Sequence, residues 1–183
     1  MADKMEEYME DYQKIYDPKL ERDALLLCFE ELLIKNGYLI SLCNEEGSVK
    51  GFADLTVKRN GKPFSIHVNI RNISNACLPY DPSVMRRQVA ALDVGLLPQN
   101  KDGEVTVLLG VCEIDEKKVF AIWNAFYFVG HKTNRSCYVS ANDLLKASES
   151  GLSISSYSDT PVYVATTERF AEALDKFIEV NCI

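Results

Sequence analysis

A predicted β-hairpin carries the first residues whose types and spacing are suited to chemistry. The segment 52–59 alternates, and it places Asp54 on the same face as Thr56 and Lys58. The Asn60-Gly61 pair that follows is the strongest short signal for a tight hairpin turn. The returning strand, 63–72, has one polar face, formed by Ser65, His67, Asn69 and Arg71. One carboxylate beside such a polar stripe indicates an active site, a degenerate active site, or only a hairpin.

The middle of the chain is basic, although the whole chain has a net charge of −7. Residues 50–101 hold eight lysines and arginines against three aspartates. Such a segment forms either an anion-binding face or a solvated surface that balances acidic neighbours. We predict that the nucleic-acid-binding candidates are Lys58, Arg59, Lys62, Arg86, Arg87 and Gln88, since Arg and Gln are the usual direct readers of bases. The overall acidity argues against tight nonspecific DNA binding by this chain alone.

Two further groups of residues have a binding or a structural interpretation. His131, Lys132, Asn134 and Arg135 form a polar loop, which either carries binding or simply connects two elements. Trp123 and Tyr127 are interpreted as core residues rather than as a cage for stacked bases. Nucleophilic catalysis is poorly supported, because neither of the two histidines lies in a setting such as GxSxG.

The elements that must position these residues follow from the hydrophobic periodicity. The predicted helices cover 3–15, 19–36, 83–93, 141–149 and a C-terminal segment that begins at Thr166 or Thr167. The predicted strands cover 38–43, 52–59, 63–72, 104–114, 119–129 and 161–166. The apolar run 104–114 is typical of a central buried strand. We therefore expect an α/β fold in which helices flank a mixed sheet.

Length and composition set the broad class of the protein. The chain has 183 residues, of which 47% are apolar and 26% charged, as expected of one soluble globular domain. No segment approaches the roughly 20 apolar residues that span a membrane. The acidic start, "MADKMEEYMEDYQK", is unlike a signal peptide, so we expect a cytoplasmic protein. The six cysteines lack CxxC or zinc-type spacing, and most are expected to be buried free thiols.

The order of elements within residues 20–125 resembles the restriction-endonuclease-like fold, the family named for its PD-(D/E)xK motif. The shared features are a helix, a hairpin with Asp54 on its first strand and a polar stripe on its second, and then a helix and a buried strand. The resemblance implies that an aspartate and a second acid bind divalent metal ions, which activate water. It also implies a lysine that positions the water or stabilises charge.

The motif residues of this chain depart from the family pattern. Asp54 matches the first acid and would be the metal ligand, but His67 stands at the place of the second acid and Asn69 at that of the lysine. A neutral imidazole is a poor ligand for Mg²⁺, and an asparagine cannot replace a cation. Pairing Asn69 with Arg71 restores a cation but loses the second acid. Glu30 or Glu31, on the preceding helix, would then supply a carboxylate, and we count Glu31 among the catalytic candidates.

A second resemblance covers the C-terminal part of the chain. The segment "VFAIWNAF…NRSCYVSANDLLKASESGLSI…DTPVYVATTERFAEALDKFI" is similar to domains that accompany methyltransferases and endonucleases in restriction–modification systems. We expect one domain over 1–183, with a peripheral acidic helix within 1–18, a nuclease-like core at 20–125 and a helix–strand–helix extension at 126–183.

Three functional hypotheses follow. The leading one is a nuclease-like domain with an atypical, inactive site and no cofactor, which acts in nucleic-acid recognition or as a partner in restriction or phage defence. The first alternative is a nuclease with a variant motif that uses Mg²⁺, Asp54, His67 and Glu31. The second is a protein-interaction domain, with a partner protein or a second copy, that binds no nucleic acid. Its apolar edge would be formed by Met5, Tyr8, Met9 and Tyr12.

Overall fold

The computed structural model describes residues 12–182, and a large twisted sheet dominates them. Within that range the sheet has eight strands in the order β10-β11-β8-β7-β4-β3-β2, and β1 pairs with β7. Its strands are β1 (Ile15–Tyr16), β2 (Leu39–Asn44), β3 (Ala53–Arg59), β4 (Lys62–Asn72), β7 (Glu104–Ile114), β8 (Lys117–Asn124), β10 (Leu152–Tyr157) and β11 (Thr160–Thr166). The pairing of β4 with β7 is parallel, whereas the neighbouring pairs are antiparallel. The sheet is therefore mixed, as the sequence predicts.

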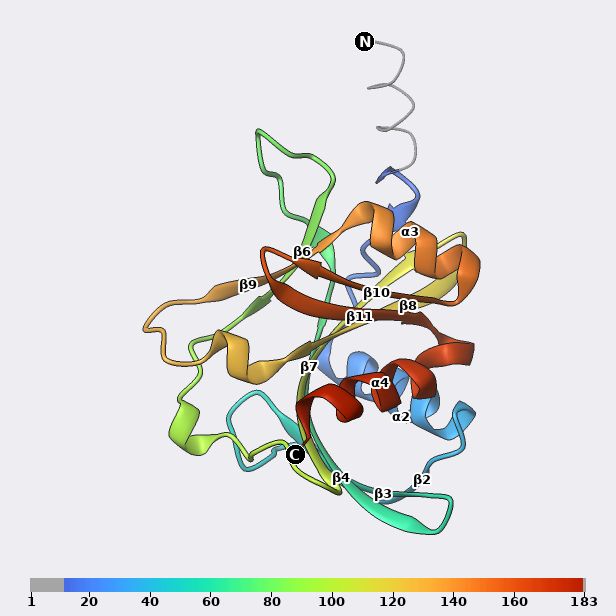
Figure 1. Cartoon of the computed structure of the whole chain (residues 1–183), viewed down its shortest axis with the longest axis vertical. Helices are drawn as coiled ribbons and strands as arrows, with labels where there is room; N and C mark the ends of the chain where they lie inside the picture. Colours follow the sequence, from blue (N-terminus) through green and yellow to red (C-terminus); the bar gives the residue numbers. More distant parts are fainter. Residues whose placement is uncertain (1–11, 183) are drawn as a thin grey trace.

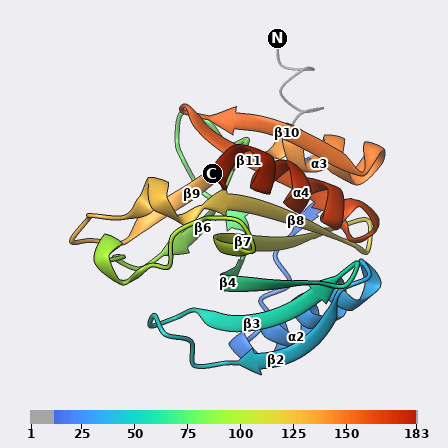
Figure 2. The same ribbon diagram turned by 60° about the horizontal axis from the view of Figure 1, so that its bottom comes forward.

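Helices and a second sheet cover the two faces of this sheet. The remaining elements are α2 (Arg22–Lys35), β5 (Ser74–Asn75), β6 (Val84–Val89), η1 (Val94–Leu96), η2 (Ala125–Phe128), β9 (Arg135–Ser140), α3 (Ala141–Ser150), η3 (Thr167–Arg169) and α4 (Phe170–Asn181). Figures 1 and 2 show α2 and α4 together on one face and α3 on the other. The small sheet β5-β6-β9 lies on the α3 side. The prediction of a mixed α/β fold flanked by helices is confirmed.

The central strand β7 joins the two layers of the core because its side chains alternate between them. Val105, Val107, Leu109 and Val111 pack with α2 and α4. Leu108 and Cys112 pack with α3 and the small sheet. A strand that is buried on both faces has to be apolar throughout, which explains the uninterrupted run at 104–114.

Local turn chemistry fixes the hairpin that carries the candidate residues. Asn60 and Gly61 have φ values of 52° and 78°, so both central residues of the turn are left-handed, as a type I′ turn requires. The turn sets the register in which Asp54 lies opposite His67. The alternation of the strands then puts Leu55 and Val57 in the core and leaves Asp54 half-buried.

The predicted helix at 83–93 is wrong, because this segment forms the strand β6, and the short helix η1 begins only after it. Antiparallel pairing with β9 satisfies the backbone of β6. The alternate residues Met85, Arg87 and Val89 are buried, which is the period of a strand rather than of a helix. Tertiary pairing thus overrides an apolar spacing that also suits a helix.

Other boundaries also differ from the prediction. The predicted strand 119–129 ends at Asn124 and continues as η2, so Trp123 is buried as predicted while Tyr127 is 50% exposed. The predicted helix 3–15 lies mostly outside the described residues, and its last residue begins β1. Cys77 is exposed, in contrast to the buried thiols of Cys28, Cys112 and Cys137.

The C-terminal segment 126–183 contains more than the expected helix–strand–helix. It adds β9 to the small sheet, and β10 and β11 to the large one. The helix α4 then packs into the same core layer as α2. Among the described residues, no helix combines the length and the apolar character that crossing a membrane requires.

Candidate functional site

The strands β3, β4 and β7 bring an imidazole between two carboxylates. Asp54 on β3 lies opposite His67 on β4. Glu104 begins β7, the parallel neighbour of β4, and lies opposite Ser65. His67 Nδ1 is 2.7 Å from Asp54 Oδ1, and His67 Nε2 is 2.9 Å from Glu104 Oε1. Lys101 Nζ approaches the other oxygen of Glu104 at 2.8 Å, and we call these four residues the His67 cluster.

The geometry of the His67 cluster defines what the ring can do. A neutral imidazole has one N–H, so both contacts are hydrogen bonds at once only when both nitrogens donate, that is, in the imidazolium form. The ring then carries the positive charge that lies between the two acids. The exposed fraction of each of these three side chains is small, at 12% for His67, 24% for Asp54 and 23% for Glu104.

The surroundings favour the ionised form of both acids. Burial opposes the ionisation of Asp54, but hydrogen bonds from His67 and from the Ser48 backbone N–H outweigh it and lower the pKa of the carboxyl. The pKa of Glu104 is lowered first by its hydrogen bond from Lys101 and then by that from His67. Gly47 leaves room for the site, because a Cβ there would lie 2.8 Å from Asp54 Oδ1.

Asn69, predicted at the place of the lysine, acts as a structural link. Its side chain is 6% exposed, and its amide donates to the Gly51 carbonyl over 2.7 Å. Its side-chain oxygen accepts from Arg87 Nη2 over 2.6 Å. The residue therefore links β4 to the loop before β3 and to β6. Its amide is neutral and already hydrogen-bonded at both ends, so it does not replace the lysine of the motif.

Arg87, predicted as a nucleic-acid contact, lies in the core with 1% of its surface exposed. Its five N–H groups reach only oxygens of amide groups: the Gln88 carbonyl, the carbonyl and side chain of Asn69, and the Leu109 carbonyl. Burial lowers the pKa of its guanidinium to about 10. The guanidinium joins β6 to β4 and β7 and is out of reach of a ligand.

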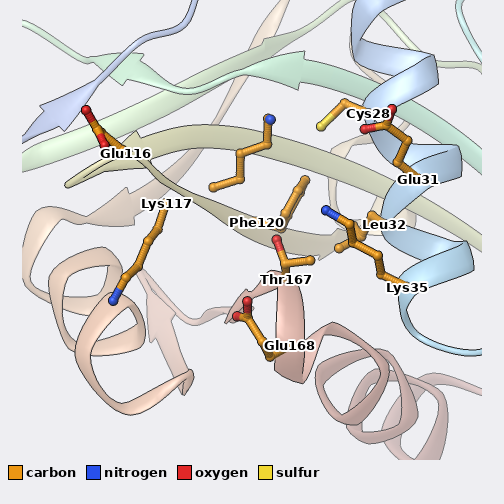
Figure 3. Close-up of a pocket in the computed structure, with 10 residues that line it drawn as sticks. Cys28, Glu31, Leu32, Lys35, Glu116, Lys117, Phe120, Thr167 and Glu168 are labelled. Carbon is orange, nitrogen blue, oxygen red and sulfur yellow. The ribbon is translucent and has the colours of Figure 1, made fainter.

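The remaining catalytic candidates do not join the His67 cluster. Arg71 is exposed and lines a small cavity with Arg22 and Gly51. Glu31 is exposed on α2 and lines a different pocket, of about 510 Å³, which Figure 3 shows. Lysines and glutamates alternate around that pocket, where Lys35 and Lys117 lie among Glu31, Glu116 and Glu168. The described part of the chain holds no group of three or more His, Cys, Asp or Glu side chains arranged to hold a metal ion.

The other predicted nucleic-acid-binding residues form two separate groups. Lys58 and Lys62 are exposed at the β3–β4 hairpin. Arg59, beside them, is bound by Asp175 over 2.6 Å and lies over the ring of Tyr38. Arg86 and Gln88 belong to β6 in the small sheet, away from the hairpin in Figure 1.

Glu104 is the acidic site residue that the sequence analysis missed, and Lys101 beside it was not named as a candidate either. Glu104 lies 37 positions from His67 and stands at the start of an apolar run, without a motif around it. The only usable signal is its place at the first residue of a central strand, next to the hairpin. That signal identifies Glu104 only if β7 is known to pair in parallel with β4.

Comparison with known proteins places the chain in a family. No curated protein and no solved structure matches it. Residues 64–174, more than half of the chain, match the model of one protein family, and they include most of β4, all of β7 and both edges of the small sheet. The chain therefore belongs to the family described as Methylase-associated X1.

Proposed function

We propose that the protein is a nuclease-like partner of a DNA methylase in a restriction–modification or phage-defence system, and that it has no nuclease activity of its own. The family description, Methylase-associated X1, supports the association with a methylase. The mixed sheet with its β3–β4 hairpin is compatible with a restriction-endonuclease-like core. The main support for the proposed absence of nuclease activity is the position of His67 between Asp54 and Glu104.

The donor set of the His67 cluster does not suit the Mg²⁺ that a nuclease of this fold would use. Mg²⁺ prefers carboxylate and water oxygens in an octahedral arrangement. Here an imidazole ring separates the two carboxylates and uses one oxygen of each. A ring that donates from both nitrogens is itself the counter-cation, and it would repel a second cation. We therefore derive no metal-dependent step at this site.

A variant nuclease is the second candidate, and one observation favours it. Glu104 is a second acid on the neighbouring strand, and Lys101 is a cation beside it. These residues would stand in for the missing acid and lysine if His67 turned away from them. The sequence analysis assigned the second carboxylate to Glu31, which lines a different pocket.

The two candidates differ in metal binding, so titration of Mg²⁺ and of Mn²⁺ by calorimetry separates them. We expect no saturable heat for the wild-type protein and the same result for Asp54→Ala. Saturable binding that Asp54→Ala or Glu104→Ala abolishes would overturn the non-catalytic proposal, and cleavage of plasmid DNA would then be measured.

The partnership needs a separate test. The tagged protein is expressed in its own organism, and the proteins that purify with it are identified by mass spectrometry. Recovery of an identified DNA methylase in a stoichiometric amount is the expected result. Recovery of the tagged protein free of any methylase would contradict the partnership and would favour an interaction domain of another kind.

A further inference from the structure

Another pocket, apart from the His67 cluster and from the cavities described above, has the composition of a ligand site. It has a volume of about 570 Å³ and lies between the loop that follows β5, the short helix η2, the strand β9 and the β10–β11 turn. These segments come from four places in the chain, and one of them, β9, lies at the left of the molecule in Figure 1. All of its lining residues fall within the segment that matches the family.

Tyrosine rings form much of the wall of this pocket. Tyr80, Tyr127, Tyr138 and Tyr157 all line it. Tyr80 is 82% exposed and Tyr127 is 50% exposed, so their rings are open to a ligand. Tyr138 and Tyr157 contact each other, with ring centroids 5.4 Å apart. Exposed aromatic rings in a concave site are platforms on which a flat ring stacks.

The polar part of the pocket suits an anionic group. The side chain of Arg135 is exposed, and it has no hydrogen-bond or ion-pair partner among residues 12–182. None of the described residues that line the pocket is acidic. The nearby carboxylate of Asp81 accepts hydrogen bonds from the backbone and the hydroxyl of Ser83. Asn134 adds an amide next to Arg135, and an amide is able to donate to and accept from the edge of a base.

We propose that this pocket binds an unpaired nucleotide of single-stranded DNA, with the base stacked on Tyr127 and the phosphate bound by Arg135. A paired base inside a duplex presents only its edges, so it cannot enter a concave site lined by rings. The inference deepens the proposed function by naming a ligand. It rests on that proposal for its setting only, because the pocket shares no residue with the His67 cluster.

Fluorescence anisotropy of a labelled oligothymidylate tests the proposal, with the same strand in a duplex for comparison. We expect saturable binding to the single strand and weaker binding to the duplex. Tyr127→Ala and Arg135→Ala each reduce the affinity by about tenfold, as loss of one stacking or phosphate contact does. Arg135→Ala also makes the plot of log affinity against log salt concentration less steep, by the amount that corresponds to about one phosphate contact. Tyr127→Phe keeps the ring and retains the affinity.

Tyr16→Ala is the matched control, because Tyr16 is an exposed tyrosine on β1 that does not line the pocket. It leaves the affinity unchanged. Binding that both pocket variants leave intact, tighter binding of the duplex, or equal competition by inorganic phosphate would each overturn the proposal. Urea unfolding of each variant shows that a loss of binding is not a loss of folding. Purification of the tagged Tyr127→Ala variant from its own organism measures separately whether a methylase is recovered. A wrong proposal for the pocket is thereby distinguished from a wrong proposal for the partnership.

Discussion

At the scale of single residues, the protein keeps its polar stripe by pairing it internally. His67 is clamped by Asp54 and Glu104, and Asn69 and Arg87 satisfy each other inside the core. All of these side chains except Glu104 occupy positions that the sequence analysis considered for catalysis or DNA binding. Their observed roles differ from the predicted ones because neighbouring strands supply hydrogen-bond partners that cannot be identified from a local sequence motif.

Replacement of His67 tests this pairing. His67→Ala removes two charge-assisted hydrogen bonds and leaves two carboxylates facing each other, so we expect a loss of about 1–3 kcal/mol in the free energy of unfolding. Urea denaturation at neutral pH measures it. His131→Ala is the control, because His131 is the other histidine of the chain and lies outside the cluster. Equal stability of the two variants would show that the clamp contributes nothing.

The same cluster predicts a dependence of stability on pH. The pKa values of Asp54 and Glu104 are lowered in the folded protein from their usual 3.8 and 4.5. As the pH falls, the unfolded chain takes up protons on these carboxyls before the folded protein does. The stabilisation that the two ionised carboxylates give the folded state is therefore present above those usual values and is lost as the pH falls below them. Urea denaturation from neutral pH to acid follows this loss. We expect the free energy of unfolding of Asp54→Asn and of Glu104→Gln to fall less steeply between neutral and acid pH than that of the wild type. An equally steep fall would show that these two carboxylates do not cause the pH dependence.

At the scale of elements, Arg87 explains how β6 is fixed to the large sheet. All five donors of its guanidinium reach oxygens on β4, β6 and β7. Arg87→Ala removes five hydrogen bonds to oxygens in or beside the core, and each buried oxygen left unsatisfied costs about 1–3 kcal/mol. We therefore expect a loss of about 3 kcal/mol or more in the free energy of unfolding.

The neighbouring residue provides the control for this prediction. Arg86 is half-exposed on the opposite face of β6, so Arg86→Ala is expected to change stability by at most about 0.5 kcal/mol. Chemical denaturation of both variants gives the comparison. If Arg87→Ala were as mild as Arg86→Ala, the guanidinium network would not be what holds β6.

Some elements were predictable because their signals are local. The apolar spacing of α2, the Asn60-Gly61 turn and the apolar run of β7 each depend on residues close in sequence. β6 was predicted as a helix and β9 was missed, because their strand character depends on pairing with each other across 45 or more intervening residues. Glu104 was missed for the same reason, since its contact with His67 exists only through the parallel pairing of β4 with β7. Asp54 and His67 were found because one hairpin holds both.

At the scale of the whole molecule, the N-terminal and C-terminal parts share one core. Asn36, at the end of α2, donates to the Thr167 carbonyl over 2.7 Å and accepts from the Ala171 backbone N–H over 3.0 Å. The rings of Phe29 and Phe170 meet edge to face with centroids 6.2 Å apart. Arg59, at the β3–β4 hairpin, binds Asp175 on α4. The helix α4 thus covers the sheet next to α2 and holds the two halves of the chain together.

This shared core predicts that residues 1–125 do not fold without the rest. Removal of 126–183 takes away β11, the partner of β8, and exposes the apolar face that Phe170, Leu174 and Phe177 cover. A truncated protein with so much unpaired edge and uncovered apolar surface is expected to aggregate or to unfold without cooperativity. Circular dichroism during urea denaturation compares it with the full chain, for which we expect a single cooperative transition. A cooperative transition for residues 1–125 would instead show that the predicted nuclease-like core is an independent folding unit, to which the C-terminal segment is an addition.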